Sequence, residues 1–105
     1  MQRIASTINL DPAANPAEYK RRHDEIWPEM VQALRGAGIH NYDIFLHGST
    51  LFATLEVDDV AAMRRILAHD PTNARWQEYM RDMIGFDLDP ETGFPKLLPK
   101  MFHMD

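Results

Sequence analysis

The sequence predicts an α+β fold in which helices cover one face of an antiparallel sheet. Three observations lead to this expectation: short segments alternate apolar and polar residues, longer segments space their apolar residues as a helix does, and the two kinds of segment follow a recognisable order. The chain has 105 residues, of which 45% are hydrophobic and 26% are charged. This size and composition suit one globular domain spanning residues 1–105.

The first predicted strand spans residues 3–10, where the side chains at every second position are mostly apolar. The sequence DPAANP ends the strand, and a helix is predicted from Pro16 to Leu34 because its apolar residues recur at helical spacing. Pro28 lacks an N–H group and disfavours helical geometry at the preceding Trp27. We therefore expect this helix to kink or to restart at Pro28.

A β-hairpin is predicted next in the chain. Residues 41–46 and 50–57 alternate in polarity, and the intervening HGS offers Gly48 for a positive φ angle. Because side chains alternate along a strand, the first of these strands places Tyr42 on one face and Phe45 on the other.

Two amphipathic helices follow the hairpin. They are predicted over residues 58–68 and 69–85, and Gly85 suits the end of the second helix. Residues 86–100 are rich in proline and predict an irregular arm, after which KMFHM at 100–104 predicts a last short strand.

Taken in order, these elements give the pattern β-α-β-β-α-α-β, which is that of the split βαβ, or ferredoxin-like, fold. The helices would cover one face of the sheet and leave the other face open. The open face would be half apolar, since it carries Phe45, Phe52, Thr7 and Thr54. A second copy of the chain is the simplest cover for such a surface, so we expect a homodimer.

Composition argues against several classes of function. The formal net charge is −5 and no basic run is longer than KRR, so we do not expect a nucleic-acid-binding surface. The chain has no cysteine and its histidines lack the spacing of a metal site, so we expect neither thiolate chemistry nor a metal. No segment approaches the ~20 apolar residues of a membrane span or resembles a signal peptide. We expect a cytoplasmic protein without a membrane partner.

The segment AEYKRRHDEIWP combines aromatic and titratable side chains. Tyr19, His23 and Trp27 fall four residues apart and so share one face of the predicted helix. The unperturbed imidazole pKa of about 6.5 suits proton transfer at neutral pH. Spacing alone fits a packed face with polar tips slightly better than a cavity that binds a ligand.

Four segments together resemble the L-rhamnose mutarotase family: YKRRHDEIWPEM (19–30), GIHNYDIFL (38–46), LFATLEV (51–57) and RWQEYM (75–80). They stand in the family's order, and the chain ends with a matching FHM. The resemblance implies a dimeric α/β barrel built from ferredoxin-like subunits. It also implies a sugar mutarotase that interconverts the α and β anomers of a 6-deoxy aldohexose by acid/base ring opening, without a cofactor.

The resemblance also implies roles for individual residues. The family's proton-donating histidine matches His23, and its sugar-contacting tyrosines match Tyr19 and Tyr42. A tryptophan pair of the family matches Trp76 but not its neighbour, which is Gln77. Glutamine offers a hydrogen-bond donor and an acceptor where indole offers an apolar wall and one N–H. The resemblance makes L-rhamnose the expected substrate, and Gln77 makes L-fucose, another 6-deoxy sugar with a different hydroxyl configuration, the alternative.

Two other interpretations stay open. Dimeric ferredoxin-like barrels also include cofactor-free monooxygenases and haem-binding proteins, in which His23 would be a base or a haem ligand. In a ligand-sensing module without catalysis, Tyr19, His23 and Trp27 would belong to the core. Under the mutarotase interpretation only Trp27 is a packed residue, at the bend before Pro28.

Overall fold

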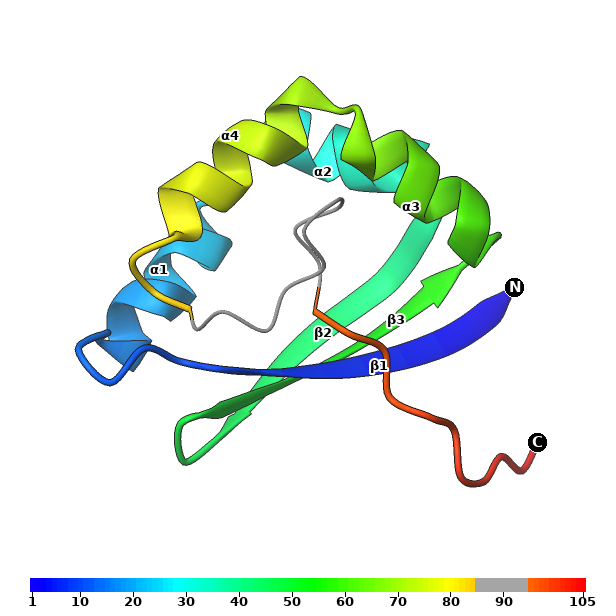
Figure 1. Cartoon of the computed structure of the whole chain (residues 1–105), viewed down its shortest axis with the longest axis horizontal. Coiled ribbons are helices and arrows are strands. Elements are labelled where there is room, and N and C mark those ends of the chain that lie inside the picture. Colours follow the sequence, from blue (N-terminus) through cyan, green and yellow to red (C-terminus); the bar gives the residue numbers. More distant parts are fainter. Residues whose placement is uncertain (85–94) are drawn as a thin grey trace.

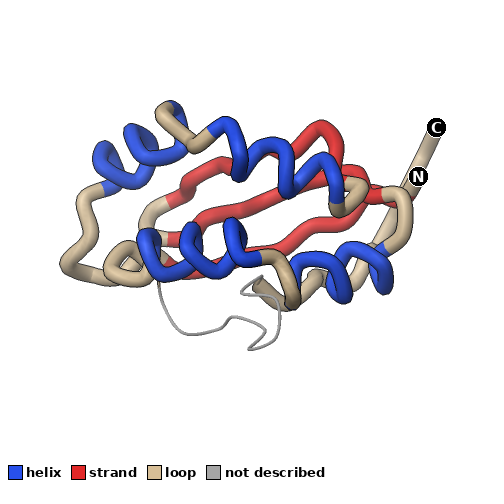
Figure 2. The backbone as a smooth tube through the Cα atoms, turned by 90° about the horizontal axis from the view of Figure 1, so that it is seen from above, coloured by secondary structure: helices blue, strands red, loops and turns tan. Residues whose placement is uncertain are grey.

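The computed structural model describes residues 1–84 and 95–105. Its elements, in chain order, are β1 (Gln2–Asn9), α1 (Pro16–Asp24), α2 (Pro28–Gly36), β2 (Ile39–His47), β3 (Thr50–Val57), α3 (Val60–Ala68) and α4 (Pro71–Met80). The helices all lie on one face of the sheet (Figure 1). Seen from above, α1 and α2 form one row and α3 and α4 the other (Figure 2). The predicted α+β class, with helices on one face of the sheet, is confirmed.

The sheet of the described residues is antiparallel and has the strand order β1-β3-β2. The predicted hairpin is confirmed, because β2 pairs with β3 and Gly48 between them has a φ of 62°. The first strand pairs with the other side of β3, from Gln2 opposite Val57 to Asn9 opposite Thr50. Strand β3 is therefore the centre of the sheet and β2 lies at one edge.

Pro28 restarts the helix instead of kinking it. Helix α1 ends at Asp24, and Trp27 caps α2 in an extended conformation with φ −62° and ψ 135°. Proline at the first helical position loses no hydrogen bond, because the first N–H groups of a helix have no partner within it. The helix that carries Tyr19 and His23 is thus separate from the helix that follows.

Aspartates begin both later helices. Asp59 and Asp70 cap α3 and α4, each accepting a backbone N–H through a side-chain oxygen. Helix α4 ends at Met80, so the helix predicted over 69–85 is too long. The predicted stop at Gly85 lies outside the described residues, as does the arm up to residue 94.

The prediction of a last strand at 100–104 is wrong. The chain meets β1 earlier, where Leu97 forms an isolated bridge with Ser6. Pro99 has no N–H with which to continue a ladder, so pairing does not extend beyond it. Residues 100–104 are exposed and have no regular structure, and they leave the molecule on the side away from the helices (Figure 1).

In the part of the chain that the structure describes, two clusters of buried apolar residues form the core. The cluster between the sheet and α3 includes Ile4, Ile39, Leu55, Val57, Met63 and Leu67. The cluster around α2 and α4 consists of Met30, Trp76, Met80 and Met83. On the opposite face of the sheet, Phe45 and Phe52 are 61% and 40% exposed, and no described helix covers them. The predicted open and partly apolar face is confirmed.

Candidate active site

Helix α1 presents Tyr19 and His23 on one face, as their spacing predicts. The helix begins at Asn15, whose side-chain oxygen accepts the N–H of Ala17 at 2.9 Å, and Pro16 occupies its first position. The rings of Tyr19 and His23 stack with their centroids 4.4 Å apart and an interplanar angle of 27°. Local helix geometry therefore places the two side chains side by side.

The hydrogen bonding of His23 determines which ring nitrogen is available. Its Nδ1 lies 3.1 Å from the carbonyl oxygen of Tyr19. A carbonyl oxygen can only accept, so Nδ1 carries the proton and Nε2 of the neutral ring is an acceptor. Burial lowers the pKa of His23, and the opposing effects of the Tyr19 carbonyl and of Asp24 are smaller. His23 is therefore mostly neutral at pH 7, with Nε2 able to take a proton.

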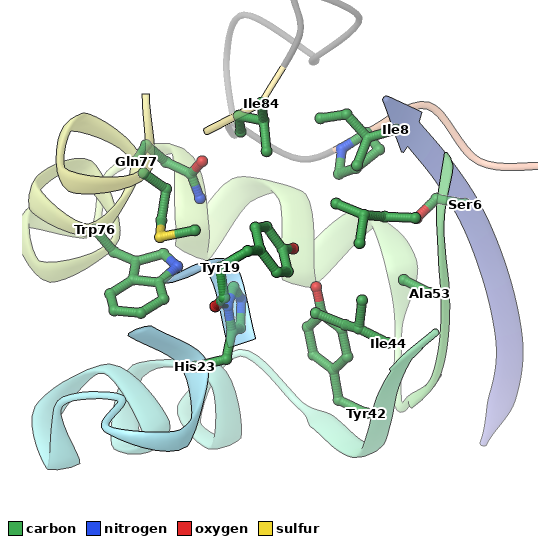
Figure 3. A pocket seen from close by; sticks show the side chains of 13 residues that line it. Ser6, Ile8, Tyr19, His23, Tyr42, Ile44, Ala53, Trp76, Gln77 and Ile84 are labelled. Carbon is green, nitrogen blue, oxygen red and sulfur yellow. Dashed lines mark hydrogen bonds between the residues drawn. The ribbon is translucent and has the colours of Figure 1, made fainter. Parts of the chain in front are cut away.

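Tyr19 and Tyr42 remain protonated at neutral pH. Burial, with a smaller contribution from Tyr42, raises the pKa of Tyr19 far above its usual value. Burial also raises the pKa of Tyr42, to about 12. The two phenol groups approach each other from α1 and β2 (Figure 3). Neutral phenols can donate hydrogen bonds to a ligand, but they do not act as phenolate bases near pH 7.

The pairing of β2 with β3 contains one extra residue in β2. Ile39 pairs with Val57 and Ile44 pairs with Ala53. Both pairs lie on the helix-covered face, yet they are separated by five positions in β2 (44 − 39) and by four in β3 (57 − 53). The extra residue is a β-bulge, the device by which a strand changes which side chains face inward.

The bulge turns Tyr42 toward the helices. Asn41, the residue before it, has a positive φ of 48°, a conformation that asparagine tolerates better than most residues. The side-chain nitrogen of Asn41 donates to Oε1 of Glu56 at 2.9 Å, which ties the bulge to β3. Without the extra residue, the alternation that begins at Ile39 would direct Tyr42 to the open face.

Helix α4 supplies Trp76 and Gln77. The Trp76 ring is buried and meets two other rings at right angles: His23 with centroids 5.4 Å apart, and Trp27 with centroids 5.1 Å apart. These edge-to-face contacts hold α1 and the start of α2 against α4. Trp27 packs against the buried cluster around Trp76, which confirms its predicted packing role.

Arg22 forms a polar clamp between α1 and the end of α4. Its guanidinium lies 2.9 Å from Glu18 and 2.8 Å from Asp82, donates to the Tyr79 carbonyl at 2.9 Å, and stacks 4.7 Å from the centroid of the Tyr79 ring. Hydrogen bonds from Arg21 and Arg22 lower the pKa of Glu18 to about 2, and those from Arg22 lower the pKa of Asp82. The clamp fixes the helix that bears His23 relative to the helix that bears Trp76.

These side chains line one cavity. An inner space of about 70 Å³ adjoins a groove of about 1090 Å³ that opens between α1, α2 and β2. The lining shared by both consists of Tyr19, His23, Tyr42, Ile44, Leu51, Trp76 and Gln77. The structure thus brings together every residue that the sequence singled out for catalysis or sugar binding, around the inner space and the groove that adjoins it.

Sequence reasoning missed the part of the lining that β1 and the segment after α4 provide. Ser6, Ile8 and Ile84 face the tyrosines across the cavity (Figure 3). Ser6 is buried on the same strand face as Ile4 and Ile8. A single hydroxyl among apolar positions of an inner strand face was the signal that could have revealed it.

The chemistry available in the cavity comes from side chains that hydrogen-bond or pack. Within residues 1–84 and 95–105, no group of three or more His, Asp or Glu side chains is arranged to hold a metal ion. No helix in that part of the chain is long and apolar enough to cross a membrane. The inner space presents the imidazole of His23, two phenols, the hydroxyl of Ser6, an amide and an apolar wall.

The family model for L-rhamnose mutarotase matches residues 3–104, which is nearly the whole chain. This protein belongs to the L-rhamnose mutarotase family. The family resemblance inferred from the four sequence segments is confirmed, and the family is one of isomerases, as that resemblance implied.

Individual L-rhamnose mutarotases agree with the family model. The relative from Acidiphilium cryptum is 44% identical over 107 residues, covering 99% of each chain. The relative from Listeria monocytogenes is 48% identical over 82 residues, covering 76% of this chain and 77% of its own. The crystal structure of the L-rhamnose mutarotase from Formosa agariphila matches this fold with a TM-score of 0.79 at 29% identity, covering 100% of both chains.

Proposed function

We propose that this protein is a mutarotase that interconverts the α and β anomers of L-rhamnose. The observation that carries the proposal is the setting of His23, a neutral imidazole with Nε2 as acceptor beside two protonated phenols, in an inner space that adjoins a larger groove. Membership of the L-rhamnose mutarotase family supports both the reaction and the sugar.

The reaction needs one proton to pass between two oxygens of the sugar. The anomeric hydroxyl loses its proton, the C1–O5 bond breaks, and O5 gains a proton. The aldehyde then rotates and the ring closes on its other face by the reverse steps. Because both oxygens are attached to C1, one nitrogen beside C1 can serve both. In our proposal, Nε2 of His23 takes the proton of the anomeric hydroxyl, and the resulting imidazolium donates it to O5.

Tyr19 and Tyr42 bind and orient the sugar. Their raised pKa values exclude them as the base, so we assign them hydrogen-bond donation to sugar oxygens, including the oxygens that gain negative charge as the proton moves. Trp76 supplies an aromatic wall and Gln77 supplies the polar contact on the same helix. His23 is then the catalytic residue, and the other four are substrate-binding residues.

The apolar part of the cavity suits a 6-deoxy sugar. Ile8, Ile44 and Leu51 offer a surface against which the C6 methyl group can pack without leaving a hydroxyl unpaired. L-rhamnose and L-fucose share that methyl group and differ in the configuration of ring hydroxyls. We prefer L-rhamnose because the relatives named above carry that name, and we keep L-fucose as the comparison sugar.

We further infer that the protein works in the cytoplasm as a homodimer of single domains, each spanning residues 1–105. The open sheet face with Phe45 and Phe52 supports the dimer, since two such faces packed together would close a barrel. The proposed reaction uses no cofactor or metal, and nothing in the charge pattern calls for a nucleic-acid or membrane partner.

The test is exchange NMR of the anomeric protons of L-rhamnose and L-fucose in the presence of the purified protein. We expect faster α/β exchange than in buffer, with L-rhamnose the better substrate. In His23→Asn the rate should fall by about 10²–10⁴-fold, the size of a general acid–base contribution. His69→Asn is the matched control, because His69 is exposed at the end of α3 and does not line the cavity.

A rate equal to that in buffer for a panel of 6-deoxy and other aldoses would refute the proposal. The two other interpretations then predict different results. A haem-binding protein shifts the Soret band of added haem, whereas a sensing module shows sugar binding by NMR without any exchange.

A further inference from the structure

A buried asparagine precedes Gln77 by one helical turn. Asn73 is 2% exposed, and its backbone N–H donates to the capping oxygen Oδ1 of Asp70 at 2.9 Å. Its side-chain nitrogen donates to the carbonyl oxygen of Leu67 at 3.2 Å. Because a carbonyl can only accept, the NH₂ end of the Asn73 amide has to face Leu67, and its Oδ1 has to face the other way.

The orientation of Asn73 fixes that of Gln77. Nε2 of Gln77 lies 3.2 Å from Oδ1 of Asn73. The amide oxygen of Asn73 can only accept a hydrogen bond, so Gln77 has to present its NH₂ end to Asn73. The carbonyl of Leu67 thus determines, through two amides in series, which atom of Gln77 is left for the cavity.

The atom left for the cavity is the carbonyl oxygen Oε1. Gln77 lines both the inner space and the groove, and its amide lies above Tyr19 and near Ile84 (Figure 3). Among residues 1–84 and 95–105, no group donates a hydrogen bond to this oxygen within the geometric limits that the other bonds satisfy. A ligand hydroxyl is the partner that the cavity can supply.

We propose that Asn73 is a positioning residue that holds Gln77 with Oε1 as an acceptor, so that the site selects an aldose with a donating hydroxyl at that position. The inference rests on the proposed mutarotase function. It assigns Gln77 a defined polarity in place of the donor-or-acceptor ambiguity of a free amide. An indole at this position would offer only an N–H donor and could not accept a sugar hydroxyl.

The polarity of Gln77 complements that of the tyrosines. The neutral phenols of Tyr19 and Tyr42 can donate to sugar oxygens, whereas Oε1 of Gln77 and Nε2 of His23 accept from sugar hydroxyls. A hydroxyl group is both donor and acceptor, so a sugar ring between these side chains can satisfy both kinds of partner.

Three substitutions separate the orientation of Gln77 from other effects. Gln77→Met keeps the length of the side chain and removes the acceptor. Asn73→Leu keeps the volume at 73 but removes the oxygen that holds Gln77. Asn73→Asp is its matched control, since it also disturbs the bond to Leu67 but still offers an oxygen to Nε2 of Gln77. Both Asn73 variants should lose similar thermal stability, which a melting curve checks.

The decisive ligands are L-rhamnose and its monodeoxy and monodeoxyfluoro analogues at C2, C3 and C4. Fluorine cannot donate a hydrogen bond, so an accepting Oε1 should reject the deoxy and the deoxyfluoro analogue at one position equally. We expect the wild type to bind both about 3- to 10-fold more weakly than L-rhamnose, the size of one neutral hydrogen bond. In Gln77→Met and Asn73→Leu the discrimination should disappear, and Asn73→Asp should retain it.

If the monodeoxyfluoro analogues at C2, C3 and C4 all bind the wild type as tightly as L-rhamnose does, the inference is overturned. Equal discrimination in Asn73→Leu and in the wild type would also overturn it.

The free protein provides a readout that does not depend on activity. In the wild type the NH₂ protons of Gln77 should exchange with solvent measurably more slowly than those of the exposed Gln32, and in Asn73→Leu the difference should vanish. If the wild type does not catalyse the exchange of sugar anomers yet shows slow solvent exchange of the Gln77 NH₂ protons, the proposed function fails while the orientation of Gln77 stands. If the protection is absent from the wild type, the orientation itself is wrong.

Discussion

The two faces of the sheet differ although alternate residues of the same strands build them. On the helix-covered face, β3 buries every second side chain from Leu51 to Val57, and its neighbours line the cavity. On the other face, Phe45 and Phe52 pair directly across two strands and remain exposed. Because the side-chain period of a strand is two, a shift by one residue would exchange these faces. The register of β2 and β3 is therefore as important to the candidate site as the side chains that line it.

The largest effect should come from placing a charge on the open face. Phe52→Glu would bring like charges together where we infer that two sheets meet, and it should convert a dimer into a monomer of half the mass. Sedimentation velocity at micromolar concentration measures this. Ile66→Glu is the control, since Ile66 is about as exposed as Phe52 but lies on α3. A monomeric wild type would show that the open face has no such partner.

The next largest effect concerns the clamp above the covered face. Arg22→Met keeps most of the side-chain volume but removes the bonds to Asp82 and to the Tyr79 carbonyl. We expect the free energy of unfolding to fall by about 1–3 kcal/mol, since the Arg22 side chain is only 13% exposed. Urea denaturation measures this. Arg21→Met on the exposed side of the helix should lower the free energy of unfolding by less, and an equal loss in both variants would argue against the clamp.

A smaller effect should arise at the bulge, where β2 switches its inward residues. Asn41→Gly and Asn41→Ala both lose the bond to Glu56, but only alanine resists the positive φ. Asn41→Ala should therefore be less stable than Asn41→Gly by about 1–2 kcal/mol, and it should lose more activity because Tyr42 is displaced. Thermal melts and exchange NMR test both points. If alanine matches glycine, the left-handed conformation is not needed.

The smallest effect is a pH dependence of stability due to His23. Its pKa is lower in the folded protein than in the unfolded chain, so the unfolded chain binds more protons below about pH 6.5. This group should therefore reduce stability as the pH falls through and below that value, and it should have no effect at higher pH. Urea unfolding between pH 5 and 8 measures how the free energy of unfolding depends on pH in the wild type and in His23→Asn. Parallel curves would mean that His23 has no lowered pKa.

Local patterns in the sequence were enough to predict most of the fold. Alternation predicted the strands, Pro28 predicted the helix break, and the i,i+4 spacing predicted that Tyr19 and His23 share a face. The strand at 100–104 was wrong because an apolar run was given more weight than Pro99, which cannot continue a ladder. Helix 69–85 was too long because apolar spacing continues to Met83 although regular helix ends at Met80.

The site could be predicted only as far as side-chain type and spacing reach. Spacing grouped Tyr19 with His23, but bringing Tyr42 and Trp76 beside them needed either the fold or a family resemblance. The tautomer of His23 depends on a carbonyl distance, and the bulge depends on the register with β3. Arg22 shows the same limit: its pair with Glu18 lies within one helix at i,i+4 spacing, whereas its partner Asp82 is 60 residues away in the sequence.

Helix α1 carries His23, the residue to which we assign proton transfer, yet it contributes no fully buried residue to the core. Two contacts with other parts of the chain hold this helix: the edge-to-face contact of His23 with Trp76 and the bond of Arg22 to Asp82. The break before Pro28 separates its geometry from that of α2. Outside Tyr19, Arg22 and His23, substitutions along α1 should therefore accumulate with little penalty to folding. A lineage of such enzymes could change its sugar by drift in this helix while the rest of the domain stays the same, and directed evolution of new specificity would begin here.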